Sequence, residues 1–459
     1  LARALRNDPQ LIFEFVYNNI DWQPGWGVMK GGLGCLLDGS GNSFDQSMLL
    51  VALLREAGFT ANYVMGQIEL PVTEYDAWFN TDPVSVSSYC CYWYSQYANI
   101  PGNAPTWNGT EWTMVMSHVW VNVVVSGTTY VLDPSRKTYT VKAPVANLGT
   151  ILGYNQATFL ANAQSGATVD GSGNFVQNMN ATNINADLTT MTSNLITYIQ
   201  NNAIGSAPAG TATIDDVLGG QEIVPITLPF AWSTSLAYQA PGDVPTIWTG
   251  DVPLTHKTTL QVQYPELWPG TGWVIDETFT SDQLAGTRLT LTFDATLHPV
   301  LSLNGTVIAT GSEAQGVGSW NSIQITVDHN AFASPVYPRQ WWQQYLYASE
   351  DNLFLIGNSW GNLGRGQALF HSKQASAYSV GSLANPEPSV GELMSVIWFN
   401  WAAQASRVSD LVGRMEKTYS NGFHQVGIVS NISDTVTHVA NSGTDIGGVV
   451  GFTSTLDFD

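Results

Sequence analysis

Three polar residues in the first third of the chain have the types and the order needed for acyl transfer. Ser43 stands at the entry to a leucine-rich segment, within residues 41–46 (GNSFDQ), and His118 and Asp133 follow 15 residues apart on two short apolar runs. A nucleophile at a helix N-terminus gains from the positive end of the helix dipole and from free amide groups. A histidine can take its proton, and an aspartate can orient the imidazole and stabilise its charged form.

The elements that would position these residues follow from the hydrophobic pattern. Residues 44–57 carry leucines at helical spacing and end before Gly58, a common helix stop, and residues 1–20 have a similar helical pattern. Ser126-Gly127-Thr128 predicts a hairpin turn, which would set His118 beside Asp133. Short strands are expected at 60–68, 117–125 and 130–132.

These motifs resemble those of the transglutaminase-like superfamily, in which a cysteine opens a helix, a His-Val/Ala-Trp strand follows, and a further strand ends in Asp-Pro. The stretches that carry the resemblance are Leu53-Leu54-Arg55, Tyr63-Val64-Met65-Gly66, His118-Val119-Trp120-Val121 and Leu132-Asp133-Pro134-Ser135. The resemblance implies an α+β papain-like domain over residues 1–145 and a Cys-His-Asp acyl transferase. More narrowly, the segment is similar to transglutaminase-like domains of large secreted bacterial Rhs-type polypeptides, in which a β-rich segment comes next.

The nucleophile position departs from that pattern. Counted back from Leu53-Leu54-Arg55, it falls on Ser43, and Cys35 lies eight residues earlier in an expected loop. In a first hypothesis the site is degenerate, the domain binds or scaffolds, and Ser43 with Gln46 forms a helix capping box. In a second, the serine is an engineered replacement that silences a cysteine enzyme, because a hydroxyl is far less acidic than a thiol. In a third, Ser43 is a working nucleophile or Cys35 substitutes for it.

Several neighbours of the site have two interpretations each. His118 either belongs to a triad or only hydrogen-bonds Asp133 within the core. Trp26 and Lys30, in the loop before the helix, either line a groove or are ordinary surface residues. Residues 71–112 form a long aromatic insertion that either binds a peptide or sugar or packs over the core.

Three further segments are expected after residue 145. Residues 146–217 are a polar linker with a helix at 185–202. Residues 218–335 contain short strand patterns and the hairpin sequence Asn304-Gly305, which together predict a β-sandwich-like domain. Residues 336–459 comprise an irregular segment, a long helix at 389–417 and a β tail from 423. This tail is either a hairpin packed on the long helix or a strand that pairs with another chain, and few charges oppose such edge-to-edge pairing.

The amino-acid composition argues against several classes of protein. Charged residues make up 11% of the 459 residues, against about 25% in an average domain, and 36 acidic against 15 basic residues give a net charge of −21. This balance argues against nucleic-acid or anionic-membrane binding, and no apolar run reaches the roughly 18 residues of a membrane span. Three cysteines are too few for a disulfide scaffold, although Cys35 could pair with Cys90 or Cys91. The chain begins at Leu1, so we expect a processed or excised piece of a longer polypeptide.

The sequence therefore predicts a secreted, extracellular or cell-surface protein whose transglutaminase-like domain is degenerate and serves as a binding or structural scaffold in a larger assembly. The alternative is an active transglutaminase or cysteine-protease-like acyl transferase that uses Ser43, His118 and Asp133. Expected partners are a protein or peptide, copies of the chain, or the parent polypeptide. The histidines show no metal-ligand spacing, and neither a metal nor a cofactor is predicted.

Overall fold

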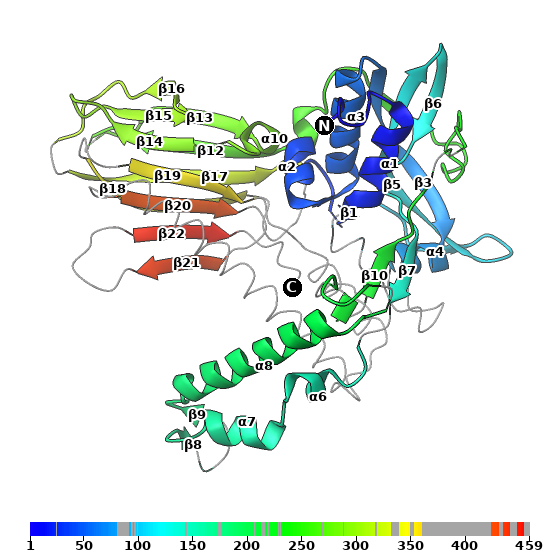
Figure 1. Ribbon diagram of the computed structural model, residues 1–459. Coiled ribbons are helices and arrows are strands. Elements are labelled where there is room, and N and C mark those ends of the chain that lie inside the picture. Colours follow the sequence, from blue (N-terminus) through cyan, green and yellow to red (C-terminus); the bar gives the residue numbers. More distant parts are fainter. Residues whose placement is uncertain are drawn as a thin grey trace. The chain divides into compact units, whose positions relative to one another are not determined.

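The computed structural model divides into two compact units (Figure 1). Unit 1 comprises Leu1–Thr138 and Pro225–Asp459, and unit 2 comprises Tyr139–Val224. The boundaries that the sequence suggests at 145, 217 and 335 stay predictions. The residues that the structure describes are 1–23, 25–79, 91, 92, 95, 98, 100–142, 145–169, 171, 176–205, 207–212, 216–217, 220–227, 229, 231–267, 270–287, 289–316, 319–331, 339–348, 353–359, 424–430, 435–440 and 448–453.

The N-terminal part of unit 1 packs a buried helix against an antiparallel sheet. Helix α3 (Ser43–Glu56) lies on strands β3 (Thr60–Pro71) and β5 (Trp112–Val125). Its leucines at helical spacing are all buried, as the pattern predicts. The helix expected over 1–20 is α1 (Pro9–Asn19), which begins late because the Asp8 carboxylate accepts hydrogen bonds from the first amides of the helix.

The sheet has the order β11-β3-β5-β4, and β6 also pairs with β5. The predicted hairpin joins β5 to β6 through Ser126 and Gly127, whose φ angles of 51° and 81° suit a two-residue turn. The expected strands at 60–68, 117–125 and 130–132 are thus present. The remaining strands of this sheet are β4 (Thr106–Trp107), β6 (Thr128–Leu132) and β11 (Thr246–Trp248).

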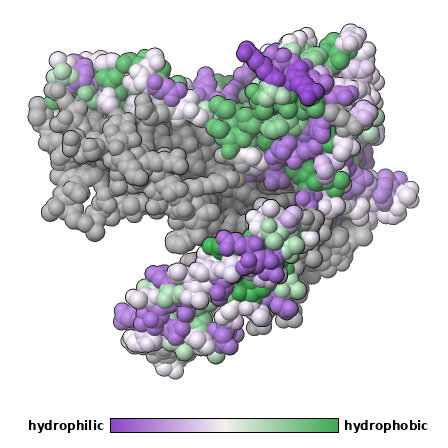
Figure 2. Space-filling view, viewed as in Figure 1, coloured by the Kyte–Doolittle hydropathy of each residue, from purple (hydrophilic) through white to green (hydrophobic). Residues whose placement is uncertain are grey.

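Two helices of this domain are not predicted by the sequence. Helix α2 (Gly31–Asp38) occupies part of the expected loop, between the paired short strands β1 (Asp21–Trp22) and β2 (Ser40–Gly41). Its three glycines disfavour helix, so only tertiary packing specifies it. Two of its leucines, Leu33 and Leu37, are exposed. Figure 2 shows a hydrophobic area of the surface where α2 lies in Figure 1.

Helix α4 (Val72–Phe79) opens the expected aromatic insertion. Most of the aromatic residues that follow in that insertion, and Cys90, lie outside the described residues. The two interpretations of the insertion, binding of a peptide or sugar and packing over the core, therefore stay predictions.

Residues 225–250, here called the strap, form part of the N-terminal domain although they are distant in sequence. Ile226 exchanges two hydrogen bonds with the Asn18 side chain, the Val131 amide donates to Ser233 O, and β11 adds to the edge of β3. Gly66 permits this close packing, because a Cβ atom there would lie 2.4 Å from Asp243 Oδ2. The domain is therefore completed by a segment that follows unit 2 in the chain.

A β-rich part with two sheets follows the strap, as the alternating runs predict. One sheet has the order β13-β12-β17-β18, and the other has the order β16-β15-β14-β19-β20-β22-β21. Apolar side chains of β12, β13, β14, β15 and β17 form one buried cluster, and Asn304-Gly305 makes the predicted turn between β15 and β16. The elements are a 3-10 helix (Leu254–His256), β12 (Thr258–Pro265), β13 (Trp273–Thr280), α10 (Ser281–Leu284), β14 (Leu289–Phe293), β15 (Pro299–Leu303), β16 (Thr306–Thr310), β17 (Trp320–His329), β18 (Arg339–Tyr347), β19 (Leu353–Ser359), β20 (His424–Ser430), β21 (Thr435–Ala440) and β22 (Gly448–Thr453).

Strand β21 stands at one end of the larger sheet. Its use as an edge for another chain stays a prediction. The long helix expected at 389–417 lies outside the described residues. Among the helices that the structure does describe, none combines the length and the apolar character needed to cross a membrane.

Unit 2 begins and ends with two paired strands, β7 (Tyr139–Lys142) and β10 (Gly220–Ile223), here called the stem. They pair antiparallel, with Tyr139 opposite Ile223. The helix expected at 185–202 begins earlier, because the Asn180 side chain accepts from the Asn183 amide. The other elements are α6 (Leu148–Leu152), α7 (Gln156–Ala163), β8 (Thr168–Val169), β9 (Val176–Gln177) and α8 (Ala181–Asn201).

The two chain ends that lead into this stem are fixed at neighbouring positions of unit 1. The Thr138 amide donates to the Tyr17 hydroxyl at 3.0 Å. Ile226 is held by the side chain of Asn18, the next residue along α1. The chain therefore leaves unit 1 and returns to it at adjacent anchors.

Candidate functional site

Ser43 is the first residue of α3, and it does not cap the helix. The capping residue is Asn42, whose Oδ1 accepts the Asp45 amide at 3.0 Å. The predicted capping box of Ser43 and Gln46 is wrong, because the cap lies one residue earlier. Gln46 Nε2 instead donates to Gly41 O at 2.7 Å. The Ser43 hydroxyl makes no hydrogen bond to any other described residue, so helix capping does not explain a serine at this position.

The start of α3 also presents backbone donors. The amides of Ser43 and Phe44 are the first two of the helix and have no partner within it. Together with the helix dipole, they favour a negative charge or a developing oxyanion at this point. An acyl-transfer site needs such donors next to its nucleophile.

The loop before α2 is bound tightly to α3. Asp45 Oδ1 accepts the amides of Met29, Lys30 and Gly31 at 3.1, 3.1 and 2.8 Å. Burial raises the pKa of Asp45 to about 6, although Lys30 and the three amides act against this rise. Trp26 and Lys30 are both buried, so the interpretation of them as surface residues is wrong. Trp26 packs edge-on against the Phe44 ring, with 4.9 Å between ring centroids.

Cys35 lies in α2 and not in a loop as the sequence suggested. It is fully buried, and its sulfur lies beside Gly41. No disulfide joins Cys35 to Cys91, so the possible pairing of these two residues is wrong. A buried residue within a helix cannot move to the Ser43 position unless α2 unfolds. The structure therefore gives no support to Cys35 as a substitute nucleophile.

His118 and Asp133 are in direct contact, as the predicted hairpin requires. His118 Nε2 lies 2.8 Å from Asp133 Oδ2, and both side chains are buried. Because Asp133 engages Nε2, the other ring nitrogen, Nδ1, is the one left for a further partner. The ring also packs edge-on against Trp78 of α4, with 5.6 Å between centroids.

Asp133 accepts hydrogen bonds at both oxygens. Oδ2 accepts from the Tyr238 hydroxyl at 2.7 Å in addition to His118, and Oδ1 accepts from the Ser135 amide and hydroxyl, each at 3.0 Å, and from the Arg136 amide at 3.1 Å. Burial alone would raise the pKa of Asp133. His118, Tyr238 and Ser135 outweigh it and hold that pKa well below its usual value, so the group is ionised.

Sequence reasoning missed Tyr238 and Ser135. Ser135 could have been found, because it follows Asp133-Pro134 directly, and its hydroxyl also lies 3.3 Å from His118 Nε2. Tyr238 is 105 residues from its partner, and no local pattern links the two. Only the path of the strap brings it to the site.

Ser43 lies on the neighbouring helix end but is not bonded to His118. The Ser47 hydroxyl, one helical turn after Ser43, donates to Val119 O at 3.3 Å. This contact sets the Ser43 face of α3 towards the part of β5 that carries His118. The structure thus joins His118 to Asp133 directly, and it joins Ser43 to them only through the packing of α3. The catalytic role of the three residues stays a prediction.

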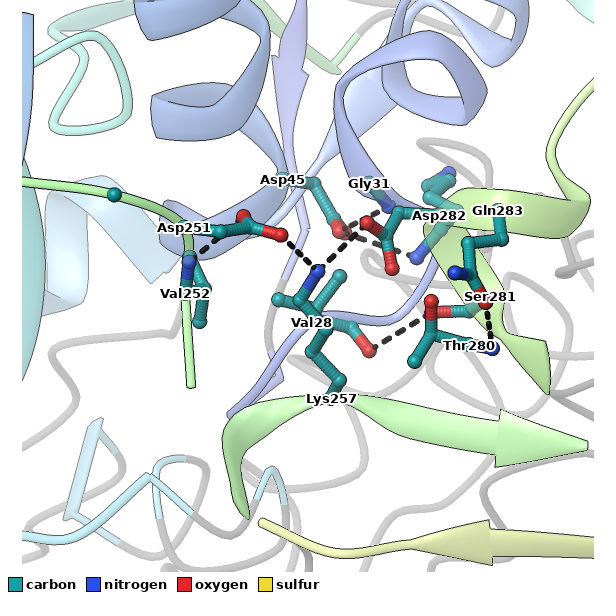
Figure 3. Close-up of polar contacts among 12 residues, drawn as sticks. Val28, Gly31, Asp45, Asp251, Val252, Lys257, Thr280, Ser281, Asp282 and Gln283 are labelled. Atoms are coloured by element: carbon teal, nitrogen blue, oxygen red, sulfur yellow. Dashed lines mark hydrogen bonds and ion pairs between the residues drawn. The ribbon is translucent and has the colours of Figure 1, made fainter. Parts of the chain in front are cut away.

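The loop before α2 is bound not only to α3 but also to the β-rich part of unit 1 (Figure 3). The Val28 amide donates to His256 O at 2.7 Å, and Val28 O accepts from the Thr258 amide and the Ser281 hydroxyl. Gly31 has φ +66°, and a Cβ atom there would lie 2.4 Å from Asp282 Cβ. Only glycine allows α2 to begin so close to α10.

A charged cluster lies beside these contacts between the loop before α2 and the β-rich part, here called the junction. Lys257 Nζ donates to Asp251 Oδ2 at 2.7 Å and to Asp282 Oδ2 at 2.8 Å (Figure 3). The Lys257 side chain is 7% exposed, that of Asp282 18% and that of Asp251 62%. No group of His, Cys, Asp or Glu side chains suited to a metal ion occurs in the described part of the chain.

Comparison with known proteins agrees with this arrangement for the first third of the chain. Residues 5–134 match the family described as the transglutaminase-like superfamily. The chain contains a transglutaminase-like domain. The match includes Ser43, His118 and Asp133, and it ends before Tyr238 and the charged junction. No curated protein and no solved structure matches the chain.

Proposed function

We propose that the transglutaminase-like domain is a binding and structural module of a larger extracellular assembly, and that its acyl-transfer site is no longer used for catalysis. The observation that carries this proposal is that Ser43 occupies the nucleophile position without a hydrogen bond to His118. A thiol can be activated by its lowered pKa, whereas a serine hydroxyl needs a base in direct contact.

The contacts of residues 28–31, which lead into α2, support a structural role for the domain. Val28 is hydrogen-bonded to the β-rich part, and Gly31 donates to Asp45 of α3 and lies beside Asp282 of α10. The strap extends the sheet of the same domain from the other side. A domain tied in this way to the rest of unit 1 suits a structural role.

The composition supports the extracellular and assembly parts of the proposal. With 11% charged residues, the surface depends on Ser, Thr, Asn and Gly for its solubility. Low charge weakens the repulsion that keeps sheet edges apart, and the resemblance to Rhs-type polypeptides implies a secreted parent. A protein or peptide segment, a second copy, or the parent polypeptide is the expected partner.

The test compares four full-length proteins: the native chain, His118→Ala, Ser43→Cys, and Ser43→Cys combined with His118→Ala. Each is incubated with a mixture of Gln- and Lys-bearing proteins and a primary amine, and products are read by mass spectrometry. We expect no amine incorporation, deamidation or cleavage by the native chain. Activity of the native chain that disappears in His118→Ala would overturn the proposal.

The assembly part is tested separately by sedimentation of the native chain over a wide concentration range. Self-association is expected. A monodisperse monomer at high concentration would contradict a role that depends on copies of the chain, and would leave the parent polypeptide or another protein as the partner.

A second candidate function is acyl transfer, and the intact pair of His118 and Asp133 favours it. The pair is buried and hydrogen-bonded, His118 Nδ1 is not engaged by Asp133, and the amides at the start of α3 are available. In the same experiment, a thioester adduct or cross-link formed by Ser43→Cys and lost with His118→Ala would mean that only the nucleophile is missing. An inert Ser43→Cys protein would mean that the groove itself has been lost.

A further inference from the structure

Tyr238 reaches the His118–Asp133 pair from outside the segment that matches the transglutaminase-like superfamily. Its hydroxyl donates to Asp133 Oδ2 at 2.7 Å, and the same oxygen lies 2.8 Å from His118 Nε2. One carboxylate oxygen is therefore shared between the histidine that the fold provides and a tyrosine that the strap provides.

Backbone hydrogen bonds between the strap and β3 hold Tyr238 in place on both sides. The Glu69 amide donates to Tyr238 O at 2.9 Å, and the Ala240 amide donates to Gln67 O at 2.9 Å. The Gln67 amide also donates to Asp243 Oδ2 at 3.0 Å. The position of the hydroxyl is thus set by pairing with β3, whose partner β5 carries His118 opposite Gly66.

The direction of the hydrogen bond is fixed by the ionisation of the two groups. Burial and the neighbouring Asp133 raise the pKa of Tyr238 well above its usual value, so the phenol keeps its proton. Asp133 is ionised and can only accept. Tyr238 is therefore the donor.

Other charged groups surround this contact, and they stay the same when only the hydroxyl is removed. The Arg136 guanidinium lies over the Tyr238 ring at 4.7 Å and pairs with Glu74 of α4. Tyr17 and Lys137 also lie close enough to act electrostatically on this cluster. Replacement by phenylalanine keeps the ring beneath Arg136, so it tests the hydroxyl alone.

We propose that Tyr238 is a positioning residue of the transglutaminase-like site: it fixes the Asp133 carboxylate and weakens the hold of that carboxylate on the His118 ring. A donor to Oδ2 stabilises the carboxylate anion and makes it a poorer acceptor for Nε2–H. The charged form of the imidazole is then stabilised less than it would be by Asp133 alone. A role of Tyr238 in catalysis rests on the second candidate function, acyl transfer. The effect of Tyr238 on the His118 ring can be measured without any reaction.

The test is nitrogen-15 and proton NMR of the full-length protein with labelled histidine, and His118→Ala identifies the His118 signals. In Tyr238→Phe we expect the Nε2-bound proton to move downfield, because Asp133 becomes the stronger acceptor. Tyr264→Phe is the matched control, since it removes a buried tyrosine hydroxyl without a hydrogen-bond partner among the described residues. An unchanged His118 signal in Tyr238→Phe would overturn the proposal.

A second measurement uses the thiol introduced by Ser43→Cys as a reporter. The pH profile of its alkylation by iodoacetamide should move to lower pH by about half a unit to one unit when Tyr238→Phe is added. An unchanged profile of a reactive thiol would count against the proposal. A thiol that shows no dependence on His118 would instead bear on the acyl-transfer candidate, and the NMR result would still decide the role of Tyr238.

Fluorinated tyrosine at position 238 covers the case in which Tyr238→Phe fails to fold. Fluorination makes the phenol a stronger donor without removing it, so the Nε2-bound proton of His118 should move upfield, opposite to the effect of phenylalanine. A shift in the same direction as phenylalanine, or no shift, would contradict the proposed sharing of Oδ2.

Discussion

Two polar clusters, one around Asp133 and one around Lys257, pair their charges in different ways. In the first, Asp133 accepts five hydrogen bonds from His118, Tyr238, Ser135 and Arg136. In the second, the Lys257 ammonium is shared by Asp251 and Asp282. The first cluster leaves a histidine nitrogen, His118 Nδ1, outside its own bonds, whereas the second leaves a buried carboxylate oxygen, Asp282 Oδ1, without a hydrogen-bond partner among the described residues. The two clusters therefore differ in the type of atom that they leave available.

The difference shows how burial alone fails to identify a functional site. Both clusters contain charges removed from water, and both compensate them with close partners, as physical chemistry requires. What separates them is the type of group that remains available. The following predictions test this contrast, from the largest expected effect to the smallest.

Asp133→Asn should cost about 4 kcal/mol of unfolding free energy. The amide that replaces one carboxylate oxygen would face donors from His118 and Tyr238 or from Ser135, and buried groups would lose their acceptor. Chemical denaturation measures the loss, with exposed Asp276→Asn as the control. The pKa of Asp133 is lower in the folded protein than in the unfolded chain. Its contribution to the free energy of unfolding is therefore present at pH values above the ordinary pKa of a carboxyl group, and it is lost as the pH falls towards the pKa of the folded protein. A loss below about 1 kcal/mol would show that the cluster does not depend on this carboxylate.

Asp45 should produce a pH dependence of the opposite sign. The pKa of Asp45 is about 6 in the folded protein, above its ordinary value of 3.8. Asp45 therefore adds its full contribution to the free energy of unfolding below pH 3.8, and this contribution is lost as the pH rises through about 6. The change is on the order of 3 kcal/mol. Asp45→Asn keeps an oxygen to accept the amides of residues 29–31 and should remove this slope. Denaturation at pH 4, 5, 6 and 7 measures it, and a slope that persists in Asp45→Asn would assign it to other groups.

Lys257→Met should cost about 2 kcal/mol, less than loss of Asp133, because one of its two partners is largely in water. Between those partners, Asp282→Asn should be more costly than Asp251→Asn, since the Asp282 side chain is 18% exposed and that of Asp251 62%. The same denaturation measurement ranks the three variants. Equal effects of the two aspartate variants would mean that exposure does not govern this junction.

Ser43→Ala should change stability least, by no more than about 0.5 kcal/mol, because its hydroxyl bonds to no other described residue. Asn42→Ala should cost about 1 kcal/mol, as expected for a lost helix cap. The two neighbouring substitutions thus separate the capping residue from the predicted nucleophile. A larger effect at Ser43 than at Asn42 would restore a structural reason for the serine.

The sequence predicts the parts of the fold that depend on local pattern. The leucine spacing gives α3, the alternation gives β3, β5 and β6, and the turn at Ser126 sets His118 beside Asp133. The capping box fails because Asn42 and Ser43 are both good capping residues, and tertiary contacts decide between them. Asn42 also donates to Gly27 O at 2.7 Å, which Ser43 is too short to do.

The rest could not be predicted, because it depends on contacts between distant segments. Helix α2 has a glycine-rich sequence that favours a loop, and it is held by packing on α3 and α10. Tyr238 reaches Asp133 from 105 residues away, and the backbone of Lys257 forms a β-bridge with that of Val28, more than two hundred residues earlier; neither belongs to a motif. A single sequence carries no local pattern for such pairs.

The stem of unit 2 has a consequence for how the chain can be rearranged. Thr138 and Ile226 are anchored on Tyr17 and Asn18, and β7 and β10 run side by side from these anchors. Residues 139–224 therefore form a cassette whose two ends meet, and a short flexible linker is long enough to bridge them. Loop-closure entropy grows slowly with length, so cassettes of very different size should be interchangeable here at little energetic cost. The site around Asp133 and this cassette are then free to diverge independently.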